Sequence, residues 1–178
     1  MAGWERALAR TIDDLEQQAA GDYLVGREAQ VADLAVAHYA EVTLASRLYA
    51  SGDLEVRLAV EGAGAVRGVV AAVGNGWVLL SSGTEVLVPL AGITTAQGLA
   101  DRALPDSVLT SRDRLGLTSA VRRLAAVGAP VVATLRDGGE VRGQLGRVGA
   151  DFVELSSEHD GSATACRLAA VALLRRQG

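Results

Sequence analysis

The spacing of apolar residues along the chain changes near residue 54. Before that point, apolar side chains recur every three or four positions, in one stripe through residues 4–15 and in another through 31–48. Such stripes are typical of amphipathic helices. Gly21 and Gly52 are natural stops for them. We therefore expect an N-terminal arm of two helices over residues 1–50.

From Leu54 onward, apolar and polar residues alternate instead. A period of two is typical of strands with one buried face. The Gly-Asn-Gly sequence at 74–76 is a strong hairpin turn. Five short antiparallel strands are expected in this part of the chain, over 54–60, 66–73, 77–82, 85–90 and 92–96.

A seventeen-residue stretch occurs twice. VRGVVAAVGNGWVLLSS covers 66–82 and VRGQLGRVGADFVELSS covers 141–157, with nine identical positions and no gap. The same order of strands is therefore expected again, after a short helix over 119–128. The expected strands of this second copy are 131–136, 140–148, 152–157, 162–168 and 170–175.

These patterns predict an α+β protein built from a helical arm and two tandem barrels. Each barrel is expected to be a closed, five-stranded antiparallel sheet, with Gly68 and Gly143 allowing the sharp bend that closure needs and Gly74 and Gly149 serving the turns. The expected parts are the arm (1–50), the first barrel (51–98), a linker (99–117), and a short helix with the second barrel (118–178).

The repeated stretch and the segment VLVPLAGITT (86–95) resemble the Sm-like family, which includes the eukaryotic Sm proteins and the bacterial RNA chaperone Hfq. The tandem arrangement with long helices resembles a class of actinobacterial proteins. The resemblance implies SH3-like barrels that join edge to edge into rings and bind RNA on the ring face. It does not extend to the RNA-reading positions, which hold Gly74 and Gly149 in place of Asp, Val78 and Val153 in place of Asn, and Leu90 and Ala91 in place of basic residues.

The charge of the chain does not favour strong binding to nucleic acid. It has 17 arginines, no lysine and 21 acidic residues, for a net charge of −4. Residues 102–147 are an exception, with eight arginines against four acids. This segment is the best candidate for an RNA-binding surface, although salt bridges and solvated faces explain the same residues. The candidate RNA-binding arginines are Arg112, Arg114, Arg122, Arg123, Arg136, Arg142 and Arg147.

Catalytic and metal-binding patterns are not visible in the sequence. His38 and His159 have no second ligand at metal spacing, and Cys166 has no partner for a disulfide. Asp151 and Glu154 are spaced to opposite faces of a strand. We therefore expect no enzyme, no cofactor and no metal. No apolar run is long enough for a membrane span and the N-terminus has no signal-peptide pattern, so a cytoplasmic protein without membrane contact is expected.

The expected function follows from the strand edges. Edges that a barrel leaves unpaired must be paired, covered or blunted, and two tandem barrels can pair one edge within the chain and offer the outer edges to other molecules. We expect a non-catalytic assembly or interaction module that self-associates or binds a protein partner, with the helical arm as the contact or the oligomer seam. The alternative is an Hfq-like RNA-binding protein that uses the arginines of the C-terminal half.

Overall fold

The protein is described by a computed structural model that covers residues 39–104, 115–128, 130–157 and 160–177. The chain divides into two compact units after Val42, and the unit that begins at Thr43 contains the two repeats. The first predicted helix, most of the second and much of the predicted linker lie outside the described residues.

Helix α2 (Leu44–Ala50) begins at a capping box. The Thr43 side chain accepts a hydrogen bond from the Ser46 backbone nitrogen, and the Ser46 side chain accepts one from the Thr43 nitrogen, both at 3.1 Å. Thr43 itself is extended, with φ −97° and ψ 159°. The prediction of one unbroken helix up to residue 50 is therefore wrong, because the chain leaves helical geometry at Thr43 and starts a new helix after it.

The first copy forms five strands in the predicted order. Apolar and polar residues alternate most clearly in β1, where every second side chain is buried. The Gly-Asn-Gly turn joins β2 to β3, as predicted. A single 3-10 turn, η1 (Leu90–Gly92), connects the last two strands. The strands are β1 (Glu55–Val60), β2 (Gly64–Gly74), β3 (Trp77–Ser81), β4 (Glu85–Pro89) and β5 (Ile93–Gln97).

The second copy repeats this order after helix α3 (Leu117–Val127), which ends at Gly128 in the left-handed conformation, with φ 70°. Its 3-10 turn, η3 (Leu168–Ala170), again separates the last two strands. The strands are β6 (Pro130–Leu135), β7 (Glu140–Val148), β8 (Phe152–Ser156), β9 (Ala163–Arg167) and β10 (Val171–Arg176).

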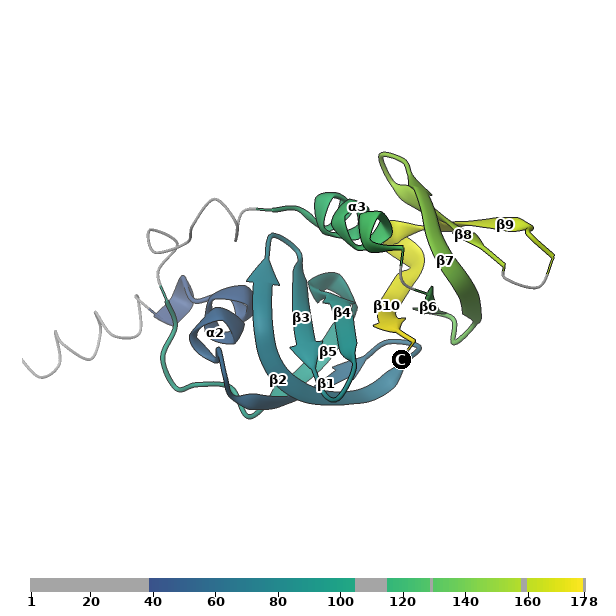
Figure 1. Ribbon diagram of the computed structural model, residues 1–178. Coiled ribbons are helices and arrows are strands. Elements are labelled where there is room, and N and C mark those ends of the chain that lie inside the picture. The colour runs from purple at the N-terminus through teal and green to yellow at the C-terminus, as the bar shows by residue number, and fades with distance from the viewer. Residues whose placement is uncertain (1–38, 105–114, 129, 158–159, 178) are drawn as a thin grey trace, which may run out of the picture. The chain divides into compact units, whose positions relative to one another are not determined.

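All ten strands belong to one antiparallel sheet, in the order β5-β1-β2-β3-β4-β10-β6-β7-β8-β9. Each copy supplies one half of this sheet, and within each half its fifth strand comes first, followed by its first to fourth strands. The halves meet where β4 pairs with β10, and Figure 1 shows the yellow β10 as the strand of the second half that lies nearest the first. The two copies are thus joined edge to edge within the chain.

The prediction of two closed five-stranded barrels, and with it the Sm-like architecture that the resemblance implied, is wrong for this chain. Closing the first copy would require β4 to pair with β5. The free edge of β4 is instead occupied by β10, which itself lies between β4 and β6. Among the described residues, β5 pairs only with β1 and β9 only with β8, so the sheet remains open at both ends.

Two hydrophobic cores lie against this sheet, and each contains residues from both copies. The first core holds Leu58, Val78 and Leu80 together with Ala172 and Leu173 of β10. The second holds Val153 and Leu155 together with Trp77 and Leu87 of the first copy. Because β3 sends alternate side chains into different cores, it is buried on both faces. The two copies therefore share their cores rather than each closing its own.

Two glycines that sequence analysis assigned to turns lie under aromatic rings. A Cβ atom at Gly74 would come within 2.3 Å of the Trp77 ring, and one at Gly149 within 2.3 Å of the Phe152 ring. Gly68 and Gly143 similarly lie close to the backbone of the adjacent strand, at Ser81 and Ser156. These four positions need glycine because a side chain would meet a neighbour that cannot easily move.

Candidate functional site

Five of the seven arginines proposed for RNA binding lie in the described residues; Arg112 and Arg114 do not. The five come from separate elements. Arg122 and Arg123 are on α3, Arg136 follows β6, and Arg142 and Arg147 are on β7. The basic segment of the sequence is therefore spread over a helix, a turn and a strand.

Four of these five arginines already have protein partners. Three form salt bridges with glutamates, Arg136 with Glu61 at 3.5 Å, Arg142 with Glu140 at 3.0 Å and Arg147 with Glu154 at 3.0 Å. Arg122 donates a hydrogen bond from Nη2 to the Gly149 carbonyl at 3.2 Å. The arginines thus favour the salt-bridge interpretation of the sequence over a dedicated phosphate-binding surface.

The junction between the copies combines backbone pairing, buried apolar side chains and a salt bridge. Leu174 and Arg175 of β10 face Leu87 and Val86 of β4. The guanidinium of Arg176 also lies 3.4 Å from the Glu85 carboxylate across this junction. Leu87 and Leu174 are both 3% exposed. Backbone pairing and apolar burial together hold the two copies to one another.

The open ends of the sheet are β5 and β9. In β5, Ile93 and Ala96 are half-buried and the other three residues are exposed. In β9 only Cys166 is buried. Strand β5 contains no charged residue and no proline, and β9 contains a single charge, Arg167, at its last position. Apart from Arg167, the two edge strands therefore lack the charges and prolines with which proteins usually prevent edge strands from pairing.

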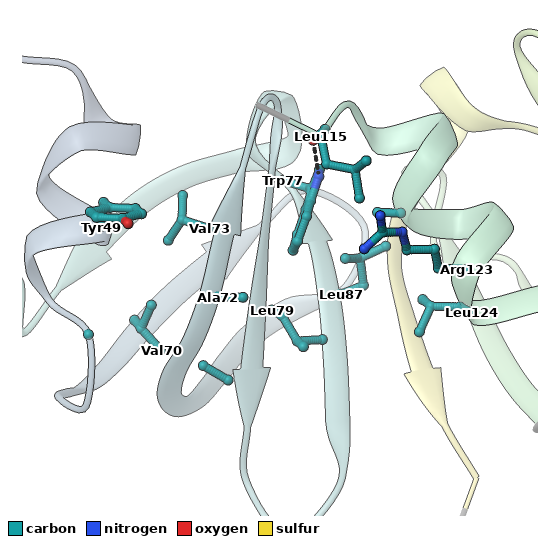
Figure 2. Close-up of a pocket in the computed structure, with 13 residues that line it drawn as sticks. Tyr49, Val70, Ala72, Val73, Trp77, Leu79, Leu87, Leu115, Arg123 and Leu124 are labelled. Carbon is teal, nitrogen blue, oxygen red and sulfur yellow. Dashed lines mark hydrogen bonds between the residues drawn. The ribbon is translucent and has the colours of Figure 1, made fainter. Parts of the chain in front are cut away.

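A pocket of about 570 Å³ lies between the two helices, over β2, β3 and β4. Figure 2 shows Tyr49 of α2 at one end of it, Arg123 and Leu124 of α3 at the other, and the Trp77 indole between them. The indole Nε1 donates a 2.8 Å hydrogen bond to the Leu115 carbonyl. The lining is otherwise aliphatic except for one cation, Arg123, and comprises Tyr49, Gly52, Val70, Ala71, Ala72, Val73, Trp77, Leu79, Leu87, Leu115, Ala120, Arg123 and Leu124.

Sequence analysis did not find this pocket. Its walls come from β2, β3, β4, α2 and α3, so its residues span Tyr49 to Leu124. The one available signal was Trp77, one of two tryptophans in a chain with only 3% aromatic residues. A large ring among small aliphatic residues marks a place where the core must accommodate an unusual shape.

The remaining reactive side chains do not assemble into a catalytic or metal site among the described residues. No group of three or more His, Cys, Asp or Glu side chains is placed to hold a metal there. Cys166 is buried, and burial raises the pKa of its thiol. Hydrogen bonds from Ser162 lower the pKa of the exposed Asp160. His38 and His159 lie outside the described residues.

The described helices are too short or too polar to cross a membrane. No protein family model matches the chain, and no curated protein matches it. The resemblance to Sm-like proteins therefore gains no support from these comparisons.

Proposed function

We propose that this protein is a non-catalytic assembly module. Separate molecules join head to tail, with strand β9 of one molecule pairing with strand β5 of the next. The observation that carries the proposal is the β4–β10 junction, where one copy of the repeat already joins the other. Strand β9 is the equivalent of β4 in the second copy, and β5 is the equivalent of β10 in the first copy. Both lie at the open ends of the sheet. A contact that is made within the chain can thus be repeated between chains.

The correspondence between the strands is position by position. The η turns that follow β4 and β9 start at Leu90 and Leu168, so equivalent residues in this part of the repeat are 78 positions apart. By the same offset, β4 (Glu85–Pro89) matches β9 (Ala163–Arg167), and β5 starts at Ile93 where β10 starts at Val171.

This correspondence specifies the register between chains. Within the chain, Leu87 faces Leu174 and Val86 faces Arg175. The equivalent pairs would be Ala165 with Ala96, and Thr164 with Gln97, each between two neighbouring molecules. Small and uncharged side chains at these positions leave no like charges opposed across the new junction.

A salt bridge between the two repeats can also form between neighbouring molecules. Glu61 and Arg136 occupy equivalent positions, 75 residues apart, in the turns that follow β1 and β6, and they pair at 3.5 Å. In a head-to-tail arrangement, Arg136 of one molecule would meet Glu61 of the next. The opposite charges at equivalent positions therefore favour this arrangement.

Head-to-tail contacts between different surfaces of the same protein form rings when the rotation closes and filaments when it does not. The proposal therefore predicts either a closed ring of defined mass or a concentration-dependent series of larger species. The alternative function, RNA binding through the arginines of the C-terminal half, has less support, because four of the five described arginines are already engaged by the protein.

The mass of the purified full chain, measured by light scattering after size-exclusion chromatography over a range of concentrations, tests the proposal. Gln97 and Thr164 are exposed, so charges can be placed there without disturbing a core. The like-charged double variant Gln97→Glu, Thr164→Glu should reduce the mass to that of one chain. The complementary pair Gln97→Lys, Thr164→Glu should retain the assembly.

Gln144→Glu serves as the matched control, because Gln144 is exposed on the interior strand β7. This variant should assemble as the unmodified chain does. A monomeric unmodified protein at every concentration would refute the proposal. An unchanged mass for the like-charged variant would refute the specified register.

A further inference from the structure

The pocket between α2 and α3 differs from the rest of the apolar interior because it remains open and contains a cation. Its sheet wall is formed by small and aliphatic residues, among them Val70, Ala72, Leu79 and Leu87. Its volume of about 570 Å³ lies within the range of pockets that hold small ligands. It is formed by one chain, so it does not depend on assembly.

Arg123 is the single charged residue in the pocket lining, and no acidic side chain accompanies it there. Among the described residues Arg123 forms no salt bridge. Its guanidinium extends from α3 toward the sheet wall near Leu87 (Figure 2). A positive charge at the side of an apolar cavity is complementary to a ligand with one anionic group.

The equivalent arginine in the first copy is used differently. The sequence RLYASG (47–52) matches RLAAVG (123–128), so Arg47 corresponds to Arg123. The Arg47 guanidinium donates from Nε and Nη2 to the Ala100 carbonyl, at 3.1 and 2.7 Å. Arg47 thus binds the protein's own backbone, whereas Arg123 is directed to the pocket.

The other polar groups of the pocket restrict the ligand further. The Trp77 Nε1 hydrogen is already donated to Leu115, so the indole presents an apolar ring to the cavity. A nucleotide or sugar would place many polar groups against Val70, Leu79 and Leu87 without partners, which is unfavourable. An aliphatic tail would instead be buried against these side chains.

We propose that this pocket binds an unbranched aliphatic carboxylate, such as a fatty acid, with its tail among the sheet residues and its carboxylate on Arg123. The guanidinium can bind a carboxylate through two parallel hydrogen bonds. A second, smaller cavity shares Leu79, Leu87 and Leu124 with the pocket and lies next to β10. Longer tails would extend along these shared leucines.

Isothermal titration of the full chain with sodium decanoate, dodecanoate and tetradecanoate, each kept below its micelle concentration, tests the proposal. One ligand per chain is expected, with the affinity rising about fourfold for each added methylene. Dodecanol, which has the same tail and no charge, should bind roughly tenfold more weakly. An absence of binding by all three carboxylates would overturn the proposal.

Arg123→Gln should weaken dodecanoate binding about tenfold and leave dodecanol binding unchanged. The matched control is Arg122→Gln, since the neighbouring side chain contacts Gly149 and not the pocket. Ala71, which is exposed and lines the pocket, gives a second variant. Ala71→Trp should fill the cavity and abolish binding of both ligands while circular dichroism confirms the fold.

Equal losses in the Arg122 and Arg123 variants, or full binding by the Ala71 variant, would place the ligand elsewhere and overturn the proposal. Sedimentation with phosphatidylglycerol vesicles distinguishes a free ligand from a membrane lipid. A chain that sediments with these vesicles but does not bind monomeric dodecanoate would also overturn it, because the anionic group would then be that of a bilayer.

Discussion

The indole of Trp77 donates a 2.8 Å hydrogen bond to the backbone carbonyl of Leu115, 38 positions later in the sequence. Trp77 is only 8% exposed and belongs to the core that also contains Val121 and Val153. One side chain of the first copy therefore contributes apolar area to a shared core and donates a hydrogen bond to the segment just before α3.

Replacing Trp77 should separate these two contributions. Trp77→Phe removes the donor and leaves the Leu115 carbonyl without it, which should lower the free energy of unfolding by about 1–3 kcal/mol. Trp77→Ala also removes the ring and should cost about 3–5 kcal/mol. Urea denaturation followed by circular dichroism measures both. Equal losses in the two variants would mean that the hydrogen bond, and not the ring, accounts for the stability.

The glycines beneath the aromatic rings should be intolerant of even one methyl group. In Gly74→Ala the new Cβ would meet the Trp77 ring, and in Gly149→Ala the Phe152 ring, each at 2.3 Å. Displacing a packed ring should lower the free energy of unfolding by about 1–3 kcal/mol. Gly52→Ala is the control, because the nearest atom to its Cβ would be 3.7 Å away. Thermal unfolding of the three variants gives the comparison, and a loss for Gly52→Ala as large as for the other two would contradict the steric explanation.

Local sequence signals predicted local structure well. The Gly-Asn-Gly turn joins β2 to β3, and α3 ends at Gly128, both as expected. The interruption before α2 was missed, because the apolar stripe continues through Thr43 while the capping hydrogen bonds of Thr43 and Ser46 start a new helix. The spacing of apolar residues alone does not show where side-chain hydrogen bonds to the backbone interrupt a helix.

The arrangement of the strands was less predictable, and the reason is physical. Alternation reports which face of a strand is buried, but not which strand occupies each edge. The pairing of Leu87 with Leu174 is therefore absent from the pattern, although it is what keeps the first copy from closing. The apolar run from Val78 to Leu80 did indicate that the repeats share their cores, since a strand buried on both faces must lie between two layers. The pocket was out of reach because its lining comes from separate elements between α2 and α3, which only the tertiary fold brings together.

Binding of single-stranded RNA should be weak and should not depend on Arg122 and Arg123 alone. A labelled RNA pool titrated at about 50 and 200 mM salt provides the measurement, because phosphate contacts lose affinity steeply over that range. The variant Arg122→Glu, Arg123→Glu is the comparison. Salt-sensitive binding that this variant abolishes would favour RNA binding over assembly as the function.

Cys166 should be protected from thiol reagents in the folded protein. The thiol is 5% exposed and burial raises its pKa, so it stays neutral at a pH at which a free cysteine begins to ionise. A neutral thiol stabilises the fold fully below the ordinary cysteine pKa, and this contribution is lost as the pH rises through the raised value. Labelling with Ellman's reagent at about pH 8, with and without urea, should show slow reaction in the native state and fast reaction when unfolded. Equal rates would mean that β9 opens readily.

The junction between the copies should depend on apolar burial far more than on its salt bridge. Arg176 and Glu85 are 3.4 Å apart with side chains 55% and 50% exposed, so solvent screens their attraction. Arg176→Gln should change the free energy of unfolding by less than about 1 kcal/mol. Leu174→Ala, at a position 3% exposed in the same strand, should cost about 2–5 kcal/mol. Urea denaturation at low and high salt compares them, and a larger effect for Arg176→Gln at low salt than for Leu174→Ala would contradict this account. Because the proposed contact between β9 and β5 has alanines where Leu87 and Leu174 stand, it should be weaker than the internal junction and should dissociate first on dilution.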